Sequence, residues 1–237
     1  MLRAVIADLH LGERPDDLPR FAALAGELLA RGVFEATFLG DLFRTLVAYP
    51  RYWDATVSAG LEVLAGLRAA GVRVVLVEGN RDFFLDEPCL DPYRDASGVA
   101  HSFSAGGRRF LLEHGDLVNR QDRLYRFWRS LSKSRLARWG ARMVPAGLAR
   151  QAVTRTERRL ARTNFSYRRQ LPEADLERQA RRHFASGVDT VFWGHFHRDW
   201  RFEVGGRQAL CVPAWAETGT VAWVGGDGAI QLLSGRE

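Results

Sequence analysis

Five short segments of this chain carry side chains of the kinds that bind metal ions. They supply carboxylate, amide and imidazole groups but no thiolate, a set that suits manganese, iron or zinc in a reactive site rather than a structural zinc site. Seven such ligands are too many for one open catalytic ion, but they suit two ions that share a carboxylate. Two ions about 3.5–4 Å apart can activate water and clamp a phosphoryl group during hydrolysis. The candidate metal ligands are Asp8, His10, Asp41, Asn80, His114, His195 and His197.

The elements expected before these segments would bring them to one edge of a sheet. Apolar runs with strand composition lead directly into four of the five segments. Helical spacing of apolar residues between the first three runs gives a β-α-β-α-β order, which predicts parallel strands joined by helical crossovers. In such sheets ligands bind just beyond the carboxyl ends of the strands. The predicted strands are 2–7, 36–39, 72–77 and 190–193, and the first two helices span about 21–29 and 52–70.

The second half of the chain is predicted to be less regular. Residues 101–104 and 108–113 read as a hairpin that leads into His114. A helix is expected over 172–184, and alternating residues over 201–233 predict an antiparallel meander.

Length and composition favour a single domain with one inserted segment. The chain has 237 residues and 46% hydrophobic content, enough for one sizeable core. We expect no spanning helix, since no apolar run approaches eighteen residues. The first apolar run meets Asp8 too early for a secretory signal. Two cysteines, Cys89 and Cys211, form no framework and no metal spacing. These features predict a cytoplasmic protein with reduced thiols.

Positive charge is concentrated in one segment. Residues 120–169 hold fifteen Arg or Lys and two acids, whereas the rest of the chain holds nineteen bases and twenty-six acids. The segment therefore carries a net charge of +13 and the remainder −7, which predicts contact with something anionic. Leu124, Phe127, Trp128 and Leu131 have the spacing of an amphipathic helix. A second arginine-rich helix is expected over about 148–163.

Two interpretations of this insertion remain open. Its helices could pack their apolar faces on the body of the protein. Alternatively, they form a lid whose apolar face is partly exposed and holds a lipid or a membrane, since aromatic and leucine side chains beside arginines are typical of interfacial helices.

Each polar segment alone has a structural explanation, such as a strand-end turn or a buried histidine, but the five in this order are specific. They resemble the calcineurin-like metallophosphoesterases. The resemblance covers nearly the whole chain outside the insertion and implies an α/β (α+β) fold, a four-layer sandwich of two mixed sheets flanked by helices. It implies that 1–237 is one domain and that 118–170 is an inserted helical lid. The implied ligands are Asp8, His10, Asp41 and His197 for the first metal, and Asp41 as the bridge, Asn80, His114 and His195 for the second.

Within this superfamily the motifs are most similar to the UDP-2,3-diacylglucosamine pyrophosphohydrolases of lipid A biosynthesis. The resemblance implies cleavage of a lipid-linked nucleotide sugar to UMP and 2,3-diacylglucosamine 1-phosphate (lipid X). It also implies two divalent ions, Mn²⁺ in the first place with Fe or Zn as alternatives. The implied location is peripheral, on the cytoplasmic face of the inner membrane, with the basic lid on an anionic surface. The implied substrate contacts are Asn80, Arg81, Asp122, Asn164, Ser166, Arg168 and His195.

Two positions depart from the family pattern. Arg44 stands where an acid is more usual, and Phe196 replaces the common Thr between the two histidines. Neither change removes a metal ligand, but both bear on the choice of diphosphate substrate.

Arg81 is the most informative difference from the wider superfamily, many members of which have a histidine at this position. A histidine can protonate a departing alkoxide, whereas arginine stays charged and cannot. Arginine can instead make two charge-assisted bonds to phosphate oxygens. A diphosphate substrate fits this change, because its leaving group is a phosphate that needs no proton. We therefore expect Asn80, Arg81 and His195 to act on the phosphoryl group.

Two alternatives belong to other functional classes. The first is a dinuclear phosphodiesterase or pyrophosphatase on soluble nucleotides or nucleic acid, since fifteen cations could follow a phosphate backbone. Aromatic residues on the helix face opposite the arginines favour acyl chains over bases. The second is a protein-binding scaffold without metal, which the full ligand set argues against. The oligomeric state does not follow from the sequence.

Overall fold

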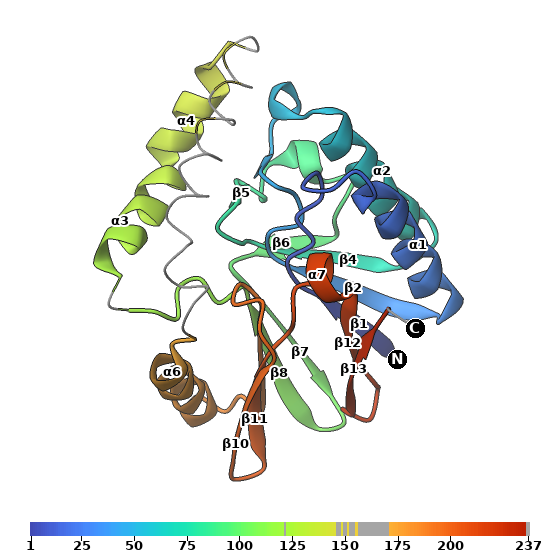
Figure 1. Ribbon diagram of the computed structural model, residues 1–237, viewed down its shortest axis with the longest axis vertical. Coiled ribbons are helices and arrows are strands. Elements are labelled where there is room, and N and C mark those ends of the chain that lie inside the picture. The colour runs from blue at the N-terminus through green and yellow to red at the C-terminus, as the bar shows by residue number, and fades with distance from the viewer. Residues whose placement is uncertain (121, 146–147, 149–150, 152–154, 156–170, 236–237) are drawn as a thin grey trace.

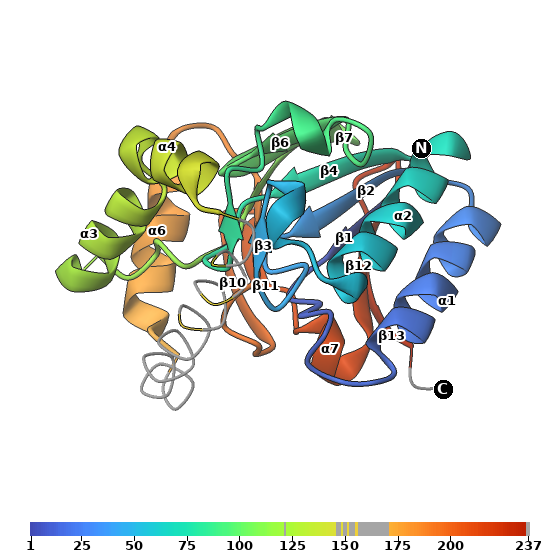
Figure 2. The same ribbon diagram turned by 90° about the horizontal axis from the view of Figure 1, so that it is seen from above.

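The computed structural model describes residues 1–120, 122–145, 148, 151, 155 and 171–235 (Figure 1). Two sheets lie face to face, and helices cover their outer faces (Figures 1 and 2). The first sheet has the order β13-β12-β1-β2-β4-β6, and the second has the order β10-β11-β9-β8-β7. Both sheets are mixed, so the predicted fold class is confirmed.

Parallel strands form the centre of the first sheet. They are β1 (Leu2–Ile6), β2 (Val33–Leu39), β4 (Arg73–Val77) and β6 (Ala96–Gly98). Helices α1 (Asp17–Ala30) and α2 (Ala55–Ala69) provide the crossovers. β12 (Thr220–Val224) pairs antiparallel with β1, and β13 (Ile230–Ser234) pairs antiparallel with β12. The last strands of the chain therefore lie beside the first.

The second sheet contains β7 (Ala100–Ala105), β8 (Arg108–Glu113), β9 (Thr190–Trp193), β10 (Trp200–Val204) and β11 (Arg207–Cys211). The hairpin of β7 and β8 is confirmed. The predicted meander over 201–233 is wrong as one unit, because β10 and β11 belong to the second sheet whereas β12 and β13 belong to the first. The short helix α7 (Trp215–Thr218) connects the two hairpins.

Alternation along the strands builds three apolar layers. On β1, Ala4 and Ile6 join α1 and α2 in an outer core, whereas Val5 points between the two sheets. On β9, Phe192 points between the sheets, whereas Val191 and Trp193 pack under α6 (Glu173–Ala185). The sheets and their helices thus form the four layers expected from the sequence.

The remaining elements lie around the carboxyl ends of the central strands. A two-stranded parallel sheet joins β3 (Leu46–Val47) to β5 (Asp82–Phe83). Two 3-10 turns span Pro50–Tyr52 (η1) and Pro88–Leu90 (η2). The helices α3 (Arg123–Ser132) and α4 (Arg135–Met143) form an arm along one side of the body (Figure 1). Most of the helix predicted over 148–163 lies outside the described residues.

Candidate metal centre

Five of the seven predicted ligands lie on left-handed backbone just past strand ends. The φ angles are 53° for Asp8, 49° for His10, 51° for Asp41, 67° for His195 and 53° for His197. Residues other than glycine seldom adopt this conformation, and it is concentrated at functional sites. The backbone therefore turns these side chains toward one place at the edge of the two sheets.

Glycines make room for this convergence. A Cβ on Gly40 would collide with the ring of His114, and one on Gly79 would collide with the carboxylate of Asp41. A Cβ on Gly194 would crowd Asp8 in the same way. The glycines that neighbour the polar segments are thus explained by close approach of backbone to ligand side chains.

Asp8, His10 and His197 form one group of ligand atoms within 4.8 Å of one another. The Nε2 atoms of both histidines lie close to Asp8 Oδ1, at 3.8 Å for His10 and 3.5 Å for His197. The two Nε2 atoms are 3.3 Å apart. Asp8 Oδ2 accepts a hydrogen bond from the backbone N–H of His195 at 2.7 Å, and its other oxygen, Oδ1, faces the two histidines.

A second group, also within 4.8 Å, contains Asp8, Asp41 and His114. His114 donates from Nδ1 to the carbonyl oxygen of Leu39 at 2.9 Å, so its Nε2 faces the site. That Nε2 lies 3.7 Å from Asp41 Oδ1 and 3.1 Å from Asn80 Oδ1. The His195 ring lies edge-on to His114 with centroids 5.1 Å apart. Asp8 is common to both groups, whereas the resemblance assigned the shared role to Asp41.

Asp82 explains why a carboxylate follows Asn80 and Arg81. It accepts hydrogen bonds from the backbone N–H groups of Asp41 at 2.8 Å and Gly79 at 2.9 Å. The backbone N–H of Arg81 donates in turn to Asp41 Oδ1 at 2.8 Å. The two strand ends are therefore joined by side chains, which fixes Asp41 relative to Asn80.

The titratable groups of this buried cluster shift one another's pKa values. Burial raises the pKa of Asp41, and the charge of Asp8 raises it further. Burial also lowers the pKa of His10 well below its usual value and that of His195 to about 4. The other two histidines behave differently: the charges of Asp41 and Asp8 raise the pKa of His114, and hydrogen bonding and charge from Asp8 and Glu217 raise that of His197 to about 9. Binding of a metal ion to these two rings would therefore release protons.

Unpartnered atoms support the same fit. Asp8 Oδ1 and His10 Nδ1 are buried and have no hydrogen-bond partner. Buried polar atoms without partners are rare, because their desolvation is costly. A divalent cation would satisfy Asp8 Oδ1 and the nearby Nε2 atoms together. The donor set, its burial and its charge thus fit two divalent ions.

Arg81 lies at this cluster and has an acidic partner that the sequence did not reveal. Its guanidinium donates to Glu13 Oε1 at 2.7 Å, and its Nε is 3.6 Å from Asp41 Oδ2. Arg81 is 8% exposed. It is therefore held beside the candidate metal ligands, with Glu13 on its outer side.

Buried ion pairs attach α3 to the body close to the cluster. Arg129 donates from Nε to Asp116 Oδ2 at 2.5 Å, and the Tyr125 hydroxyl donates to the same oxygen. Lys133 lies 2.9 Å from Glu78 Oε1 and donates to the carbonyl oxygen of Gly79. The cationic side of α3 thus contacts the two loops that carry His114 and Asn80.

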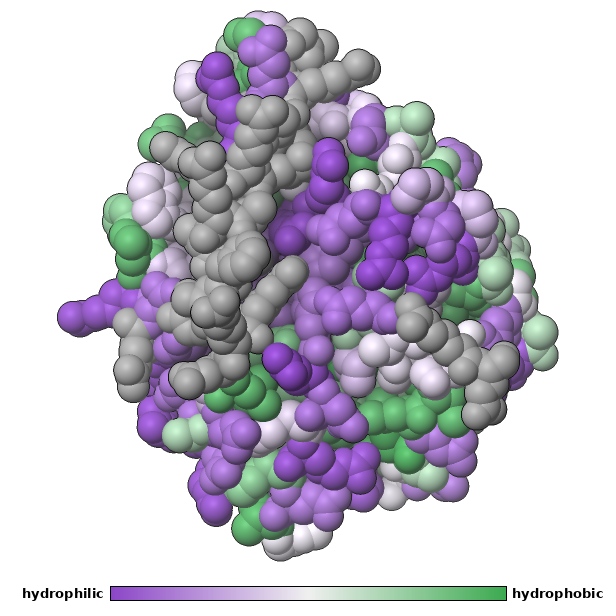
Figure 3. All heavy atoms as spheres, viewed as in Figure 1, coloured by the Kyte–Doolittle hydropathy of each residue, from purple (hydrophilic) through white to green (hydrophobic). Residues whose placement is uncertain are grey.

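The opposite side of α3 and α4 is apolar and exposed. Figure 3 shows hydrophobic side chains on the rim of the molecule where Figure 1 places these helices. These side chains are 42 to 71% exposed, so on α3 and α4 they do not pack on the body, although Ala137 and Ala141 of α4 do contact its outer core. The second helix of the insertion, expected over about 148–163, lies mostly outside the described residues. On α4, Arg138 pairs with Asp86 and Arg142 pairs with Glu87. We call the exposed residues the apolar stripe: Leu124, Phe127, Trp128, Leu131, Leu136, Trp139 and Met143.

The predicted substrate contacts of the insertion are only partly visible. Asp122 caps α3 by accepting the backbone N–H of Tyr125 at 2.8 Å, a local role that accounts for an acid there. Asn164, Ser166 and Arg168 lie outside the described residues. Two residues near the cluster were missed, Glu13 and Glu217. Neither follows a predicted strand, so no sequence signal marked them.

Comparison with known proteins agrees with this geometry. A family model described as calcineurin-like phosphoesterase matches residues 1–199. A UDP-2,3-diacylglucosamine hydrolase of Azotobacter vinelandii is 31% identical, with 96% of each chain covered. One of Chromobacterium violaceum is 32% identical, with 81% of each chain covered. The structure of an archaeal phosphodiesterase superposes with a TM-score of 0.54 over 99% of each chain at 12% identity, which supports the fold alone.

The motif resemblance drawn from the sequence is thereby confirmed. Because the family model spans most of the chain and the relatives match over most of their length, the chain belongs to the calcineurin-like phosphoesterase family and, within it, to the proteins named UDP-2,3-diacylglucosamine hydrolases.

Proposed function

We propose that this protein is a dinuclear-metal hydrolase that cleaves the diphosphate of UDP-2,3-diacylglucosamine to UMP and 2,3-diacylglucosamine 1-phosphate. The observation that carries the proposal is the placement of Arg81 beside the ligand cluster. A buried arginine there can bind phosphate oxygens but cannot protonate a leaving group. The names of the relatives supply the identity of the substrate.

The residues that would hold the two ions are those of the cluster. Asp8, His10, Asp41 and His197 would hold one ion, and Asp41, Asn80, His114 and His195 the other. We propose Mn²⁺, which suits oxygen and imidazole donors, with Fe or Zn as alternatives. Bound metal ions supply Lewis acidity, which lowers the pKa of water and neutralises phosphoryl oxygens.

The chain's own side chains would position the diphosphate. Asn80 and His195 would orient the attacked phosphoryl group, and Arg81 would donate hydrogen bonds to its oxygens as negative charge builds up. The Arg81 guanidinium donates a hydrogen bond to Glu13, so an incoming phosphate would compete with that carboxylate for Arg81. The departing phosphate monoester is stable as an anion, which removes the need for a general acid.

We further propose that residues 118–170 form a lid that meets both lipid and membrane. In this proposal the apolar stripe lies at the acyl region of an anionic bilayer on the cytoplasmic face of the inner membrane. No helix in the described part of the chain is long and apolar enough to cross a membrane. Asp122, Asn164, Ser166 and Arg168 remain proposed lid contacts to the substrate.

One observation weighs against the nucleic-acid alternative. Four cationic side chains of the described insertion, Arg129, Lys133, Arg138 and Arg142, pair with acids of the body. Those charges are engaged within the protein and would not follow a phosphate backbone without breaking these pairs.

The test is incubation of the purified protein and Mn²⁺ with UDP-2,3-diacylglucosamine and, separately, with a generic aryl phosphodiester. We expect UMP from the first and little product from the second. Arg81→His should lose diphosphate cleavage, and Arg178→Gln on the exposed face of α6 serves as the matched control. Hydrolysis of the diester alone would rule out the lipid substrate, and Arg81→His with unchanged diphosphate cleavage would rule out the role of Arg81.

A further inference from the structure

Glu217 lies outside every polar segment of the sequence and beyond the residues that the family model matches, 1–199. It belongs to α7, between the two C-terminal hairpins. Its Oε1 atom is 2.8 Å from Nδ1 of His197. The other ring nitrogen of His197, Nε2, lies 3.5 Å from Asp8 Oδ1. The imidazole thus joins Glu217 on one side to the candidate metal cluster on the other.

The helix that carries Glu217 is fixed to the strand end that carries Asp8. The backbone N–H of Trp215 donates to the carbonyl oxygen of Ala7 at 2.9 Å. The backbone N–H of Ala216 donates to the carbonyl oxygen of Asp8 at 3.3 Å. Both hydrogen bonds join backbone atoms. The backbone of α7 is therefore held directly to the strand end that carries Asp8.

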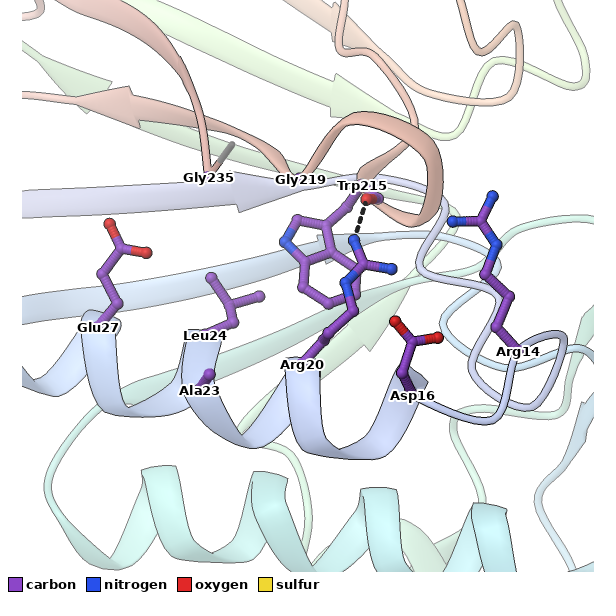
Figure 4. A pocket seen from close by; sticks show the side chains of 9 residues that line it. All are labelled: Arg14, Asp16, Arg20, Ala23, Leu24, Glu27, Trp215, Gly219 and Gly235. Carbon is purple, nitrogen blue, oxygen red and sulfur yellow. Dashed lines mark hydrogen bonds between the residues drawn. The ribbon is translucent and has the colours of Figure 1, made fainter. Parts of the chain in front are cut away.

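Two arginines, Arg14 and Arg20, contact the first residues of α7 (Figure 4). Arg14 donates to the carbonyl oxygen of Ala216 at 2.7 Å, and Arg20 donates to the same oxygen at 3.3 Å. The Arg20 guanidinium also stacks over the Trp215 ring, 4.6 Å from its centroid. Both arginines line a cavity of about 380 Å³ between α1 and α7 (Figure 4). Hydrogen bonds from charged donors are stronger than those between neutral groups, so these contacts help to hold α7 in place.

The chemistry of this contact determines where the His197 proton lies. A carboxylate can only accept a hydrogen bond, so Nδ1 of His197 must donate to Glu217. When the ring is neutral, its lone pair is then on Nε2, the atom that faces Asp8 and His10. Histidines that bind metals commonly donate their other N–H to a carboxylate in this way, which orients the ring and raises its basicity.

We propose that Glu217 is a positioning residue for the metal centre, which fixes His197 in the tautomer and orientation that present Nε2 to a divalent cation. Glu217 is half-exposed, but its place is set by α7 rather than by burial. The inference depends on the metal centre of the proposed function and is independent of the substrate.

The test is Mn²⁺ binding to the metal-free full-length protein, measured by equilibrium dialysis without substrate. Glu217→Ala should weaken the affinity roughly 10- to 100-fold, the range for loss of such a partner. Glu217→Gln keeps an oxygen that can accept from Nδ1 and should restore much of the affinity. Glu62→Ala, on the exposed face of α2, should bind as the wild type does.

Each outcome decides a separate point. Glu217→Ala with a wild-type dissociation constant and a native circular dichroism spectrum would overturn the positioning role. If Glu217→Ala does not fold, Glu217→Gln decides: affinity near wild type supports the role, and affinity as weak as that of a His197→Ala variant overturns it. A wild-type protein that binds none of Mn²⁺, Fe and Zn would overturn the metal centre itself, and with it the proposed function.

Discussion

Different interactions hold the metal cluster and the arm of α3 and α4 in place. The cluster stands on strand ends whose neighbours are fully buried, and its ligands are held by backbone geometry and by hydrogen bonds such as that from His114 to Leu39. The arm contains no buried residue, turns its apolar side outward and is attached by ion pairs. Packing therefore sets the geometry of one region, whereas electrostatics sets the position of the other.

The two regions thus differ in kind: the cluster has ligands held in a fixed geometry, whereas the arm has an exposed apolar surface. A site that must hold two cations needs rigid ligands, which a close-packed interior provides. If the arm meets a lipid, as we propose, it needs an apolar surface that is not already packed against the rest of the protein. The predictions below act on one region or on the other.

The largest effect is expected from the cluster. Asp41→Asn should lower kcat/KM for the diphosphate on the order of 10³-fold or more, because it removes a charged ligand from the metal centre. The fold should persist, since burial and the nearby Asp8 already disfavour the ionised Asp41. Activity assays with circular dichroism check both points. Asp91→Asn, on the body surface, is the control, and equal losses in the two variants would contradict the prediction.

The next effect tests how the arm is attached. Arg129→Met should destabilise the protein by about 3–5 kcal/mol, because it leaves the buried carboxylate of Asp116 without its cation. Chemical denaturation measures this free energy of unfolding. Arg138→Met, which disrupts a more exposed pair, should cost at most about 1 kcal/mol. Similar losses for the two variants would show that burial does not distinguish these pairs.

A pair of matched tryptophans compares the two regions directly. Trp193→Ala should cost about 3–5 kcal/mol because its side chain is fully buried under α6. Trp139→Ala, in the apolar stripe, should change stability by less than about 0.5 kcal/mol. The same Trp139 variant should bind anionic vesicles less well in a sedimentation assay. Vesicle binding equal to wild type would remove the stripe from the membrane contact.

The smallest effect is the pH dependence of the stability contributed by the ion pair between Arg138 of α4 and Asp86. The hydrogen bond from Arg138 lowers the pKa of Asp86 below its ordinary value of 3.8. Since the folded-state pKa is the lower one, the pair contributes stability above pH about 3.8 and loses it as the pH falls through the folded-state value. The stability difference between wild type and Asp86→Asn should therefore be at most about 1 kcal/mol at pH 7 and shrink below pH 4. Denaturant titrations across this range would reveal a constant difference if the pairing were unimportant.

Sequence periodicity was enough to predict the central strands, their parallel order and the polar residues at their ends. Apolar runs such as 72–77 carry that signal because both faces of the strand are buried. The two hairpins of the tail could not be assigned to different sheets, since alternation shows that a strand has two faces but not which strand it pairs with. The two-residue strands β3 and β5 are too short to show any period.

The sequence also could not predict which face of the arm contacts the body. Its amphipathic character was clear, but which face meets the body depends on acids such as Glu78 and Asp116 that lie far away in the chain. Glu13 and Glu217 were missed for the same reason, because their importance arises only from contact with Arg81 and His197.

The pairing of β12 with β1 has a consequence for synthesis of the protein on the ribosome. Asp8 emerges with the first strand, His197 and Glu217 emerge after β9, and β1 lacks its antiparallel neighbour until β12 has followed them. A chain that stops before β9 would therefore hold five of the seven candidate ligands beside an unpaired edge of β1. The candidate metal centre is completed only after β9 has emerged, so metal binding would report that this later part of the chain is in place.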